Sequence, residues 1–480
     1  MEQTLNYPEL ALWIDGVPRA AGNRRTLEVT DPATLAVLGR LPVATPADID
    51  EALDLARRSF PRWRDTPPLE RAAILRRAAA LMRERGALLA WLITRELGKP
   101  LPESEKEVVT AAEMFEWAAE EARRTYGRII PGRVAGIRQM AIPEPVGPVA
   151  AFSGWNAPAI TPSRKIAGAL AAGCSIVIKP SEETPAIALE IARALADAGL
   201  PAGVLGMVFG DPGEISRRLI ESPVTRMVTF TGSTSIGREL ATLAAAGLKR
   251  ATLELGGHAP VLVFDDADPE AAADAVLAAK LRNSGQICTS PTRLYAQRGV
   301  YERFVERLAE RARGWRVGNG LEAGVQMGPL ANPRRLAAME SMVSDALARG
   351  AGLAAGGARL DLPGWFWAPT VLRDAGNDCL AANTEPFGPL ALVQPFQDLE
   401  EGLALANRLP FGLASYVYTR DSGIARQATE RIESGVVCVN HCQASLPETP
   451  FGGVKDSGLG KEGGVEGLQE FMQVKYVSQM

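Results

Sequence analysis

The sequence predicts an α/β protein with a parallel sheet covered by helices. Apolar runs of strand length alternate along the chain with longer amphipathic segments that read as helices. This alternation is typical of a parallel sheet with helices on its faces. The chain has 480 residues, which is too long for one hydrophobic core, so we expect at least two domains.

The first predicted elements are helices, and strands follow. Residues 45–60 and 67–97 carry Ala, Leu and Arg at helical spacing, which predicts two amphipathic helices. Short apolar runs then predict buried strands at 149–152, 175–178, 203–209, 226–231 and 252–255. We expect the intervening helices over 184–198, from Arg238 onward and over 268–282.

Two segments interrupt the alternation. Residues 125–143 contain short extended runs around Pro131 and Gly132 and predict a hairpin. Residues 471–477 alternate roughly between apolar and polar side chains, as a strand does. These two segments are far apart in sequence, and we expect them to pair in one small projecting sheet. Its free edge would favour pairing with another subunit.

Composition excludes several classes of partner. Apolar residues make up 46% and charged residues 22% of the chain, as in a soluble globular protein. The net charge is −4 without a basic block, so we expect no nucleic-acid partner. We find neither a signal peptide nor an apolar run of membrane-spanning length, so we expect no membrane association. The five cysteines are odd in number and widely spaced, which indicates reduced thiols in a cytoplasmic protein.

Cys288 is the first candidate catalytic residue. It lies in the polar stretch Asn-Ser-Gly-Gln-Ile-Cys-Thr-Ser over 283–290, whereas a core cysteine would have aliphatic neighbours. A free thiol has a pKa of about 8.5, so it needs help to become a thiolate near neutral pH. Glu254 ends a predicted strand before two glycines and could act as a general base, although a lone glutamate is usually a surface residue. A nucleophile and a carboxylate base in one pocket are the pattern of covalent catalysis.

Asn156 is the second candidate. It lies in the segment Trp155-Asn-Ala-Pro, after the predicted strand at 149–152. Its amide could donate a hydrogen bond to a developing oxyanion.

Histidine and metal chemistry have little support. The chain has only two histidines, so a Cys–His pair would need His258 or His441, and His258 reads as structural. Cys438, His441 and Cys442 are close in sequence but lack a fourth ligand and the usual paired spacing. We therefore predict no metal site.

Two strand ends carry candidate cofactor contacts. The turn Gly232–Gly237 joins a strand to a helix, and the free N–H groups of a helix N-terminus suit a pyrophosphate. Only two glycines are present, so an ordinary glycine turn is an equal alternative. Lys179 and Glu182 directly follow another strand, where they could bind a ribose diol or could simply be solvated.

Seven short motifs, taken together, resemble the NAD(P)-dependent aldehyde dehydrogenase superfamily over nearly the whole chain. In family order they are Trp155-Asn156, Lys179–Glu182, Phe230–Ser233, Glu254–Gly257, Gly285–Cys288, Glu385–Gly388 and Pro450–Gly453. Each motif is weak alone, but seven in order at the right spacing are specific. The resemblance implies a Rossmann-like cofactor domain, an α/β catalytic domain and a small β arm for oligomerisation into dimers or tetramers. The implied ranges are 1–124 with 145–253, then 254–460, and 125–144 with 461–480.

The resemblance also implies roles for the candidate residues. Cys288 would attack the aldehyde, Asn156 and the Cys288 N–H would hold the oxyanion, and Glu254 would activate the water that hydrolyses the thioester. The implied cofactor contacts are Trp155, Lys179, Glu182, Gly232, Ser233, Glu385 and Phe387. Because the carboxylate of Glu182 would repel a ribose 2′-phosphate, we expect NAD, with NADP as the alternative.

The chain looks most like the succinate-semialdehyde and α-ketoglutarate-semialdehyde branch. Arg164 and Arg282 match positions that bind the substrate carboxylate there, and an arginine fork suits a carboxylate. Ser445 could add a hydrogen bond. Arg282 could instead form an internal ion pair. Leu446 and Pro447 give the entrance loop an apolar side, which keeps a general aliphatic or aromatic aldehyde as an alternative.

Two departures from relatives bear on mechanism. Ser290 stands where succinate-semialdehyde enzymes often carry a second cysteine, so we expect no disulfide switch in this loop. CoA-acylating relatives typically lack the general-base glutamate, and non-catalytic relatives tend to lose the nucleophile or cofactor residues. Glu254 and Cys288 are both present, which favours hydrolysis by an active enzyme.

Overall fold

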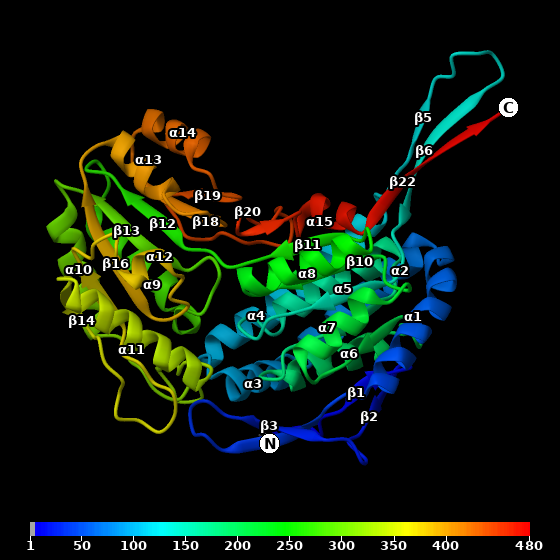
Figure 1. Ribbon diagram of the computed structural model, residues 1–480, viewed down its shortest axis with the longest axis horizontal. Helices are drawn as coiled ribbons and strands as arrows, with labels where there is room; N and C mark the ends of the chain where they lie inside the picture. The colour runs from blue at the N-terminus through cyan, green and yellow to red at the C-terminus, as the bar shows by residue number, and fades with distance from the viewer. Residues whose placement is uncertain (1–4) are drawn as a thin grey trace.

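The protein is built on two open sheets with helices on their faces (Figure 1). The computed structural model describes residues 5–480. The first sheet has eight strands in the spatial order β2 (Val17–Arg19), β1 (Leu12–Ile14), β9 (Leu205–Met207), β8 (Ile176–Lys179), β7 (Val149–Phe152), β10 (Met227–Thr231), β11 (Arg250–Glu254) and β21 (Gly458–Leu459). Its five central strands are parallel, and only the edges are antiparallel. The predicted α/β class is therefore confirmed.

Eight helices accompany the first sheet. They are α1 (Pro46–Asp65), α2 (Pro68–Glu84), α3 (Gly86–Leu97), α4 (Leu101–Ala122), α5 (Ile160–Ala172), α6 (Pro185–Asp197), α7 (Pro212–Glu221) and α8 (Thr234–Ala246). The prediction of one helix over 67–97 is wrong. Arg85 has a non-helical ψ of 10° between α2 and α3, and Gly86 after it has a low helix propensity.

The start predicted for α8 is also wrong. The helix begins at Thr234, four residues before Arg238, because only Ser233 keeps an extended conformation ahead of it. The turn Gly232–Gly237 thus contains the first turn of the helix. This difference matters for the site, since it places the free N–H groups next to Gly232 and Ser233.

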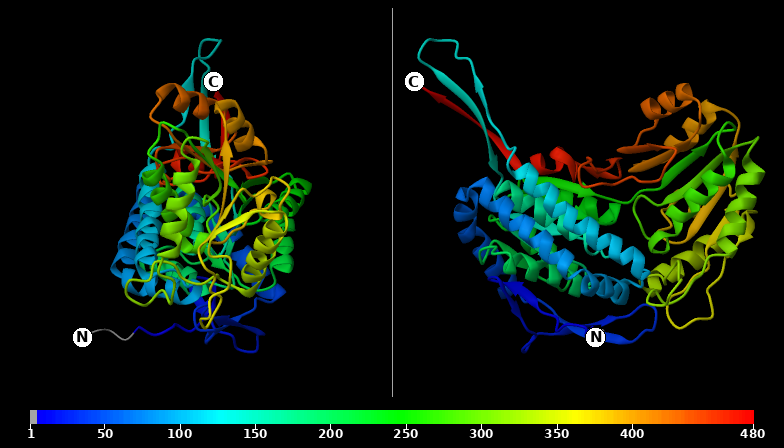
Figure 2. Two further views of the ribbon diagram at one scale, coloured as in Figure 1. Left: turned by 90° about the vertical axis from the view of Figure 1, so that its left-hand side faces the viewer. Right: turned by 180° about the vertical axis from the view of Figure 1, so that it is seen from behind.

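The second sheet has seven strands. Their order is β14 (Gly352–Ala355), β15 (Thr370–Arg373), β16 (Leu390–Phe396), β13 (Pro291–Gln297), β12 (Ala259–Val263), β18 (Ala414–Tyr418) and β19 (Val436–Val439). All pairs are parallel except β14 with β15. The helices of this part are α9 (Pro269–Leu281), the 3-10 turn Arg282–Gly285, α10 (Tyr301–Arg313), α11 (Pro333–Ala348), α12 (Leu380–Asn383), α13 (Leu399–Asn407) and α14 (Ser422–Arg431). Figure 2 shows the two sheets in separate lobes.

A long arm projects from the body (Figures 1 and 2). It consists of β5 (Arg128–Ile130), β6 (Arg138–Pro145) and β22 (Met472–Gln479). β22 runs antiparallel to β6, from the pair Met472 and Pro145 to the pair Gln479 and Arg138. The expected pairing of these distant segments is confirmed.

Short elements complete the chain. They are β3 (Thr26–Thr30) with β4 (Val37–Pro42), β17 (Phe411–Gly412) with β20 (Val454–Lys455), and α15 (Gly464–Glu470). Within residues 5–480, no helix has both the length and the apolar composition that crossing a membrane requires.

Candidate active site

A cleft of about 1210 Å³ collects most of the predicted site residues. Those that line it are Trp155, Asn156, Arg164, Gly232, Ser233, Glu254, Arg282, Cys288, Glu385, Phe387 and Ser445. Lys179 and Glu182 are not among the lining residues. Except for Glu254 at the end of β11, the other candidates lie on helix α5 and on the loops that connect the elements of both lobes. Folding therefore brings them together from distant parts of the chain.

Parallel strand register explains why several candidates meet. Thr231 at the end of β10 lies opposite Glu254 at the end of β11. Phe152 at the end of β7 likewise lies opposite Lys179 at the end of β8. The carboxyl ends of parallel strands therefore share one edge of the sheet, which is where open α/β sheets bind ligands.

The loop before Cys288 has a strained backbone. Asn283, Ser284 and Gly285 have φ values of 46°, 55° and 74°, a left-handed conformation that non-glycine residues rarely adopt. A Cβ atom on Gly285 would lie 2.1 Å from the carbonyl oxygen of Gly388, so only glycine fits there. The Ser284 hydroxyl donates to the carbonyl of Gly328 at 2.8 Å. Surrounding contacts thus hold a conformation that costs energy, as is common at functional sites.

Glu254 and Cys288 form an interacting pair. Glu254 is 3% exposed, and Cys288 is half-buried. Burial and the nearby charge of Glu462 raise the pKa of Glu254 to about 7, while hydrogen bonding with Cys288 opposes this increase. Burial and the charge of Glu254 raise the pKa of the Cys288 thiol well above its usual value. The thiol is therefore protonated at neutral pH, next to a carboxylate that can accept its proton.

The carboxamide of Asn156 is directed toward the cysteine loop. Its Nδ2 donates to the carbonyl oxygen of Gln286, two residues before Cys288, at 3.1 Å. An amide donor in this place is suited to an oxyanion formed on a carbon bound to Cys288.

The N-terminus of α8 can accept an anion. Ser233, the N-cap, contacts the Ser235 hydroxyl at 3.3 Å but accepts no hydrogen bond from the backbone, so it does not cap the first N–H groups of this 13-residue helix. A Cβ atom on Gly232 would lie 2.4 Å from the ring of Phe230. The hydroxyl of Thr231 is buried without a hydrogen-bond partner in the described chain. These groups fit the diphosphate of a dinucleotide.

The other predicted cofactor residues lie in two places. Trp155 and Phe387 pack edge to face, with ring centroids 5.4 Å apart. Burial raises the pKa of Glu385 to about 8, and this carboxyl group accepts a hydrogen bond from the Gly257 N–H at 3.2 Å. Lys179 pairs with Glu182 at 2.6 Å at the end of β8.

The two predicted substrate arginines differ in their surroundings. Arg164 donates to the Ser445 hydroxyl at 2.5 Å and lies over the Phe451 ring at 4.5 Å. Its Nε is buried without a partner, and no carboxylate of the described chain pairs with it. Arg282 is exposed and likewise forms no ion pair within residues 5–480, which argues against the internal pair considered from the sequence.

The remaining cysteine and histidine candidates have other partners, although Cys442 also lines the cleft. His258 is buried between the Thr292 hydroxyl at 2.6 Å and the Ala381 carbonyl at 3.0 Å. Cys438 contacts the Gln443 carbonyl, and Cys442 contacts the Tyr418 hydroxyl at 3.2 Å. Residues 5–480 contain no cluster of three or more His, Cys, Asp or Glu side chains able to hold a metal ion.

Sequence reasoning missed Lys99 and Glu107. Both line the cleft, and both are almost completely buried. One signal was available for Glu107, since it shares a helix face with Ala111 and Phe115, which are buried. A carboxylate on the apolar face of a helix needs a buried partner.

The fold and the cleft define a class of protein: an enzyme that couples a cysteine nucleophile and a carboxylate base to a site for a dinucleotide. The family model described as the aldehyde dehydrogenase family matches residues 19–477, and the chain belongs to that family. It is an oxidoreductase that acts on aldehydes, which confirms the resemblance drawn from the seven motifs. The family's hydride acceptor is NAD or NADP.

Individual relatives are similar over nearly their full length. The chain is 44% identical over 474 residues to 4-(hydroxymethyl)benzenesulfonate dehydrogenase of Comamonas testosteroni, covering 99% of each chain. It is 42% identical to the NADP(+) succinate-semialdehyde dehydrogenase GabD of Escherichia coli, covering 97% of this chain and 95% of that one. The crystal structure of succinate-semialdehyde dehydrogenase from Burkholderia pseudomallei has a TM-score of 0.97 at 42% identity, covering 100% and 99% of the two chains.

Proposed function

We propose that the protein oxidises an aldehyde that carries a distal anionic group, a carboxylated semialdehyde such as succinate semialdehyde above all, to the carboxylic acid. The observation that carries this proposal is Arg164. Its guanidinium lines the same cleft as Cys288 and has no carboxylate partner among the described residues. Arg164 is half-buried, and its Nε is buried without a hydrogen-bond partner, so a substrate anion would complete the site. Ser445 holds the guanidinium in place.

The proposed reaction uses the side chains of the cleft. Glu254 takes the proton of Cys288, and the sulfur attacks the aldehyde carbon to form a thiohemiacetal anion. Asn156 and the backbone N–H of Cys288 hold the negative oxygen. A bound dinucleotide supplies the acceptor for the hydride, and the carbon becomes a thioester of Cys288. Glu254 releases the thiol proton to solvent and then takes a proton from the water that attacks the thioester. The carbon–sulfur bond breaks, the acid leaves, and Glu254 returns its proton to the sulfur to restore the thiol.

Hydrolysis is favoured over acyl transfer to CoA. Glu254 is buried beside Cys288 with a pKa of about 7, so it can activate a water at neutral pH. An enzyme that uses CoA as the second nucleophile has no need of this base. The same carboxylate and thiol in one cleft also oppose a non-catalytic role.

Arg164→Leu should erase the preference for an anionic aldehyde. Removing a charge-assisted hydrogen bond loses about 1.5–3 kcal/mol, which is about a ten- to hundredfold change in kcat/KM. We expect the parent enzyme to prefer succinate semialdehyde over butyraldehyde by this factor, and Arg164→Leu to use both equally. Absorbance at 340 nm measures the reduced dinucleotide. Arg217→Leu, an exposed arginine on α7 outside the cleft, is the matched control.

The same assay separates the alternatives. Equal efficiency for both aldehydes in the parent enzyme would refute the anion site and leave a general aliphatic or aromatic aldehyde dehydrogenase. A sulfonated aldehyde belongs in the panel, because a guanidinium also binds sulfonates and one relative is named for a benzenesulfonate substrate. Higher kcat/KM for the sulfonate than for the carboxylate would change the substrate class while keeping the role of Arg164.

We propose that Trp155, Lys179, Glu182, Gly232, Ser233, Glu385 and Phe387 contact the dinucleotide. The N-terminus of α8 would receive the diphosphate, and the Lys179–Glu182 pair at the end of β8 would receive the adenosine ribose.

NAD should be the preferred acceptor. Glu182 places negative charge where a ribose 2′-phosphate would lie, and we expect kcat/KM to favour NAD by at least about tenfold. Glu182→Gln should narrow that ratio, since it removes the charge and keeps the size of the side chain. A ratio favouring NADP in the parent, as the name of the Escherichia coli relative would suggest for that enzyme, would show that Lys179 outweighs Glu182.

The arm supports a proposal about assembly. Ile129, Val474 and Tyr476 are 77%, 72% and 58% exposed on it, and its strands leave a free edge. We propose a homodimer or homotetramer formed through residues 125–144 and 461–480, with cofactor and catalytic domains over 1–124 with 145–253 and over 254–460. Five free cysteines are consistent with a cytoplasmic enzyme. Sedimentation of the intact chain would measure the oligomeric state.

A further inference from the structure

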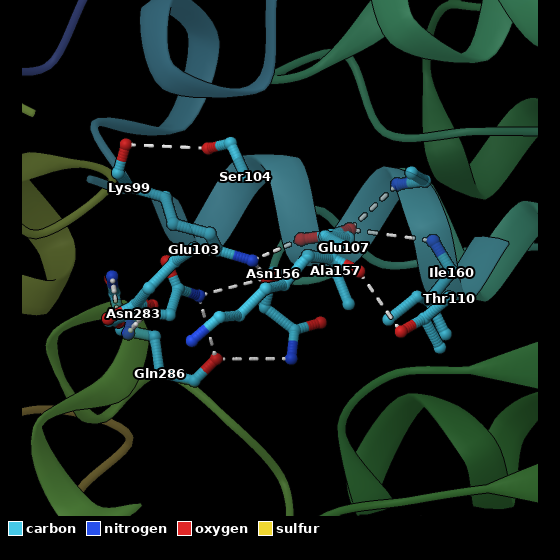
Figure 3. A network of polar contacts seen from close by, with 12 residues as sticks. Lys99, Glu103, Ser104, Glu107, Thr110, Asn156, Ala157, Ile160, Asn283 and Gln286 are labelled. Atoms are coloured by element: carbon cyan, nitrogen blue, oxygen red, sulfur yellow. Dashed lines mark hydrogen bonds and ion pairs between the residues drawn. The ribbon is translucent and has the colours of Figure 1, made fainter. Parts of the chain in front are cut away.

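A buried ion pair lies at the wall of the cleft (Figure 3). Lys99 precedes α4, Glu107 lies on α4, and their side chains are in contact. The residues are 7% and 4% exposed, so the pair is almost fully removed from water. Buried ion pairs are weak stabilisers, because the loss of hydration offsets their attraction. Their contacts with other residues indicate instead that the pair positions neighbouring groups.

Glu107 fixes the start of α5. Its Oε1 accepts the N–H groups of Ala159 at 2.9 Å and Ile160 at 3.4 Å. Ala159 has no side-chain oxygen with which to cap the helix itself, so the carboxylate of Glu107 takes the place of an N-cap. Asn156 lies three residues before Ala159, the N-cap of this helix. The backbone that carries the Asn156 amide is therefore attached to α4.

Lys99 and two neighbouring residues fix the other side of Asn156. Lys99 Nζ donates to the carbonyl oxygen of Asn156 at 3.5 Å, and Asn283 Nδ2 donates to the same oxygen at 2.9 Å. The N–H of Asn283 in turn donates to Glu103 on α4 at 2.9 Å. Asn283 belongs to the loop that carries Cys288. Helix α4 thus holds both the oxyanion donor and the cysteine loop.

We propose that Lys99 and Glu107 are positioning residues that hold the Asn156 carboxamide in register with Cys288. The inference rests on the proposed role of Asn156 as oxyanion donor. Neither residue needs to contact the aldehyde for this effect. Small displacements of a reacting group lower rates strongly, so the pair acts on kcat more than on KM.

A substitution that removes only the charge of Glu107 tests this proposal. Glu107→Gln keeps the size of the side chain and one oxygen for the N–H groups of Ala159 and Ile160. It removes the negative charge beside Lys99 and places an NH₂ donor next to an ammonium group, so the contact becomes repulsive. We expect kcat to fall by about tenfold and KM for the aldehyde to change by less than about twofold.

A double-mutant cycle tests whether the effect passes through Asn156. We expect Asn156→Ala alone to lower kcat by about 100-fold or more, as removal of an oxyanion donor does. Adding Glu107→Gln to Asn156→Ala should then cause less than about a twofold further loss, because the positioned group is absent. Glu116→Gln is the matched control, since Glu116 lies on the same helix but pairs with Arg83 on the surface. Thermal unfolding and NAD binding are measured for each variant.

The outcomes are separable. If the loss of kcat in the double variant equals the product of the losses in Glu107→Gln and Asn156→Ala, the positioning role is overturned. An Asn156→Ala enzyme with parental kcat would instead refute the proposed oxyanion donor. If Glu107→Gln does not fold, Lys99→Met takes its place in the cycle with the same expectation. Failure of both variants to fold would overturn the proposal, because the pair would then be required for the fold itself.

Discussion

Replacing Cys288 with alanine is expected to abolish aldehyde oxidation, with kcat lowered by more than about a thousandfold, while NAD still binds. The sulfur forms the covalent bond to the substrate carbon in the proposed reaction, and alanine offers no nucleophile. Binding of NAD should persist because the proposed diphosphate and ribose contacts are made by the N-terminus of α8 and the end of β8, not by the Cys288 side chain. Steady-state rates at 340 nm and calorimetric titration with NAD measure the two properties.

Cys442 provides the control for this experiment. Of the other four cysteines, Cys442 also lines the cleft, where its sulfur contacts the Tyr418 hydroxyl. Cys442→Ala should retain most of the activity. Substantial aldehyde oxidation by Cys288→Ala would show that Cys288 is not the nucleophile. Loss of aldehyde oxidation in Cys442→Ala, with Cys288 intact, would contradict the assignment as well.

Glu254→Gln should stop turnover after the first half of the reaction. Glutamine cannot accept a proton from water, so the thioester of Cys288 should persist and steady turnover should fall by more than about 100-fold. Rapid mixing should show a burst of reduced dinucleotide close to the concentration of active sites. The burst should be slow at neutral pH and faster as pH rises, because the thiol then loses its proton without Glu254.

The two roles of Glu254 can be distinguished in this trace. A burst with blocked turnover assigns Glu254 to hydrolysis. Loss of the burst at every pH would show that the glutamate is indispensable for activating the thiol, the step suggested by its contact with Cys288. Glu254→Asp, which keeps the acid on a shorter side chain, should retain part of both phases.

The parent enzyme should lose kcat as pH falls through about 7. A general base must be ionised, and burial has raised the pKa of Glu254 to about 7, so acid conditions protonate it. Glu254→Gln should lack this limb of the pH–rate profile. An unchanged limb in that variant would assign the titration to another group.

Local sequence patterns determined much of the fold. Short continuous apolar runs predicted the ends of strands β7, β8 and β10 to within one or two residues, because parallel strands that are buried on both faces have such sequences. The break between α2 and α3 was missed because Ala, Leu and Arg continue across it, and only Gly86 marks the site. The start of α8 was missed because the sequence of residues 232–237 is compatible both with a loop turn and with the first turn of a helix.

The sequence by itself also determined which chemical groups are available. Cys288, Glu254, Asn156 and Arg164 were named from motifs and neighbours, and the structure brings all four into one cleft. Glu254 and Cys288 stand out because each lies at an unusual local backbone, a strand end before two glycines and the loop with the left-handed residues 283–285. Arg164 lies within the regular helix α5 and was named from the family resemblance.

Only the tertiary structure decided how these groups behave. The pKa of Glu254 depends on burial and on Glu462, which is distant in the chain. The guanidinium of Arg164 contacts Ser445 and Phe451, which are also distant in the chain, and it forms no ion pair within residues 5–480. Lys99 looks like a surface charge in the sequence, and the helix face of Glu107 indicates burial but no partner. Only the packing of α4 against α5 places the two side chains beside Asn156. Dielectric environment and long-range contacts set these properties, and neither is encoded within a few neighbouring residues.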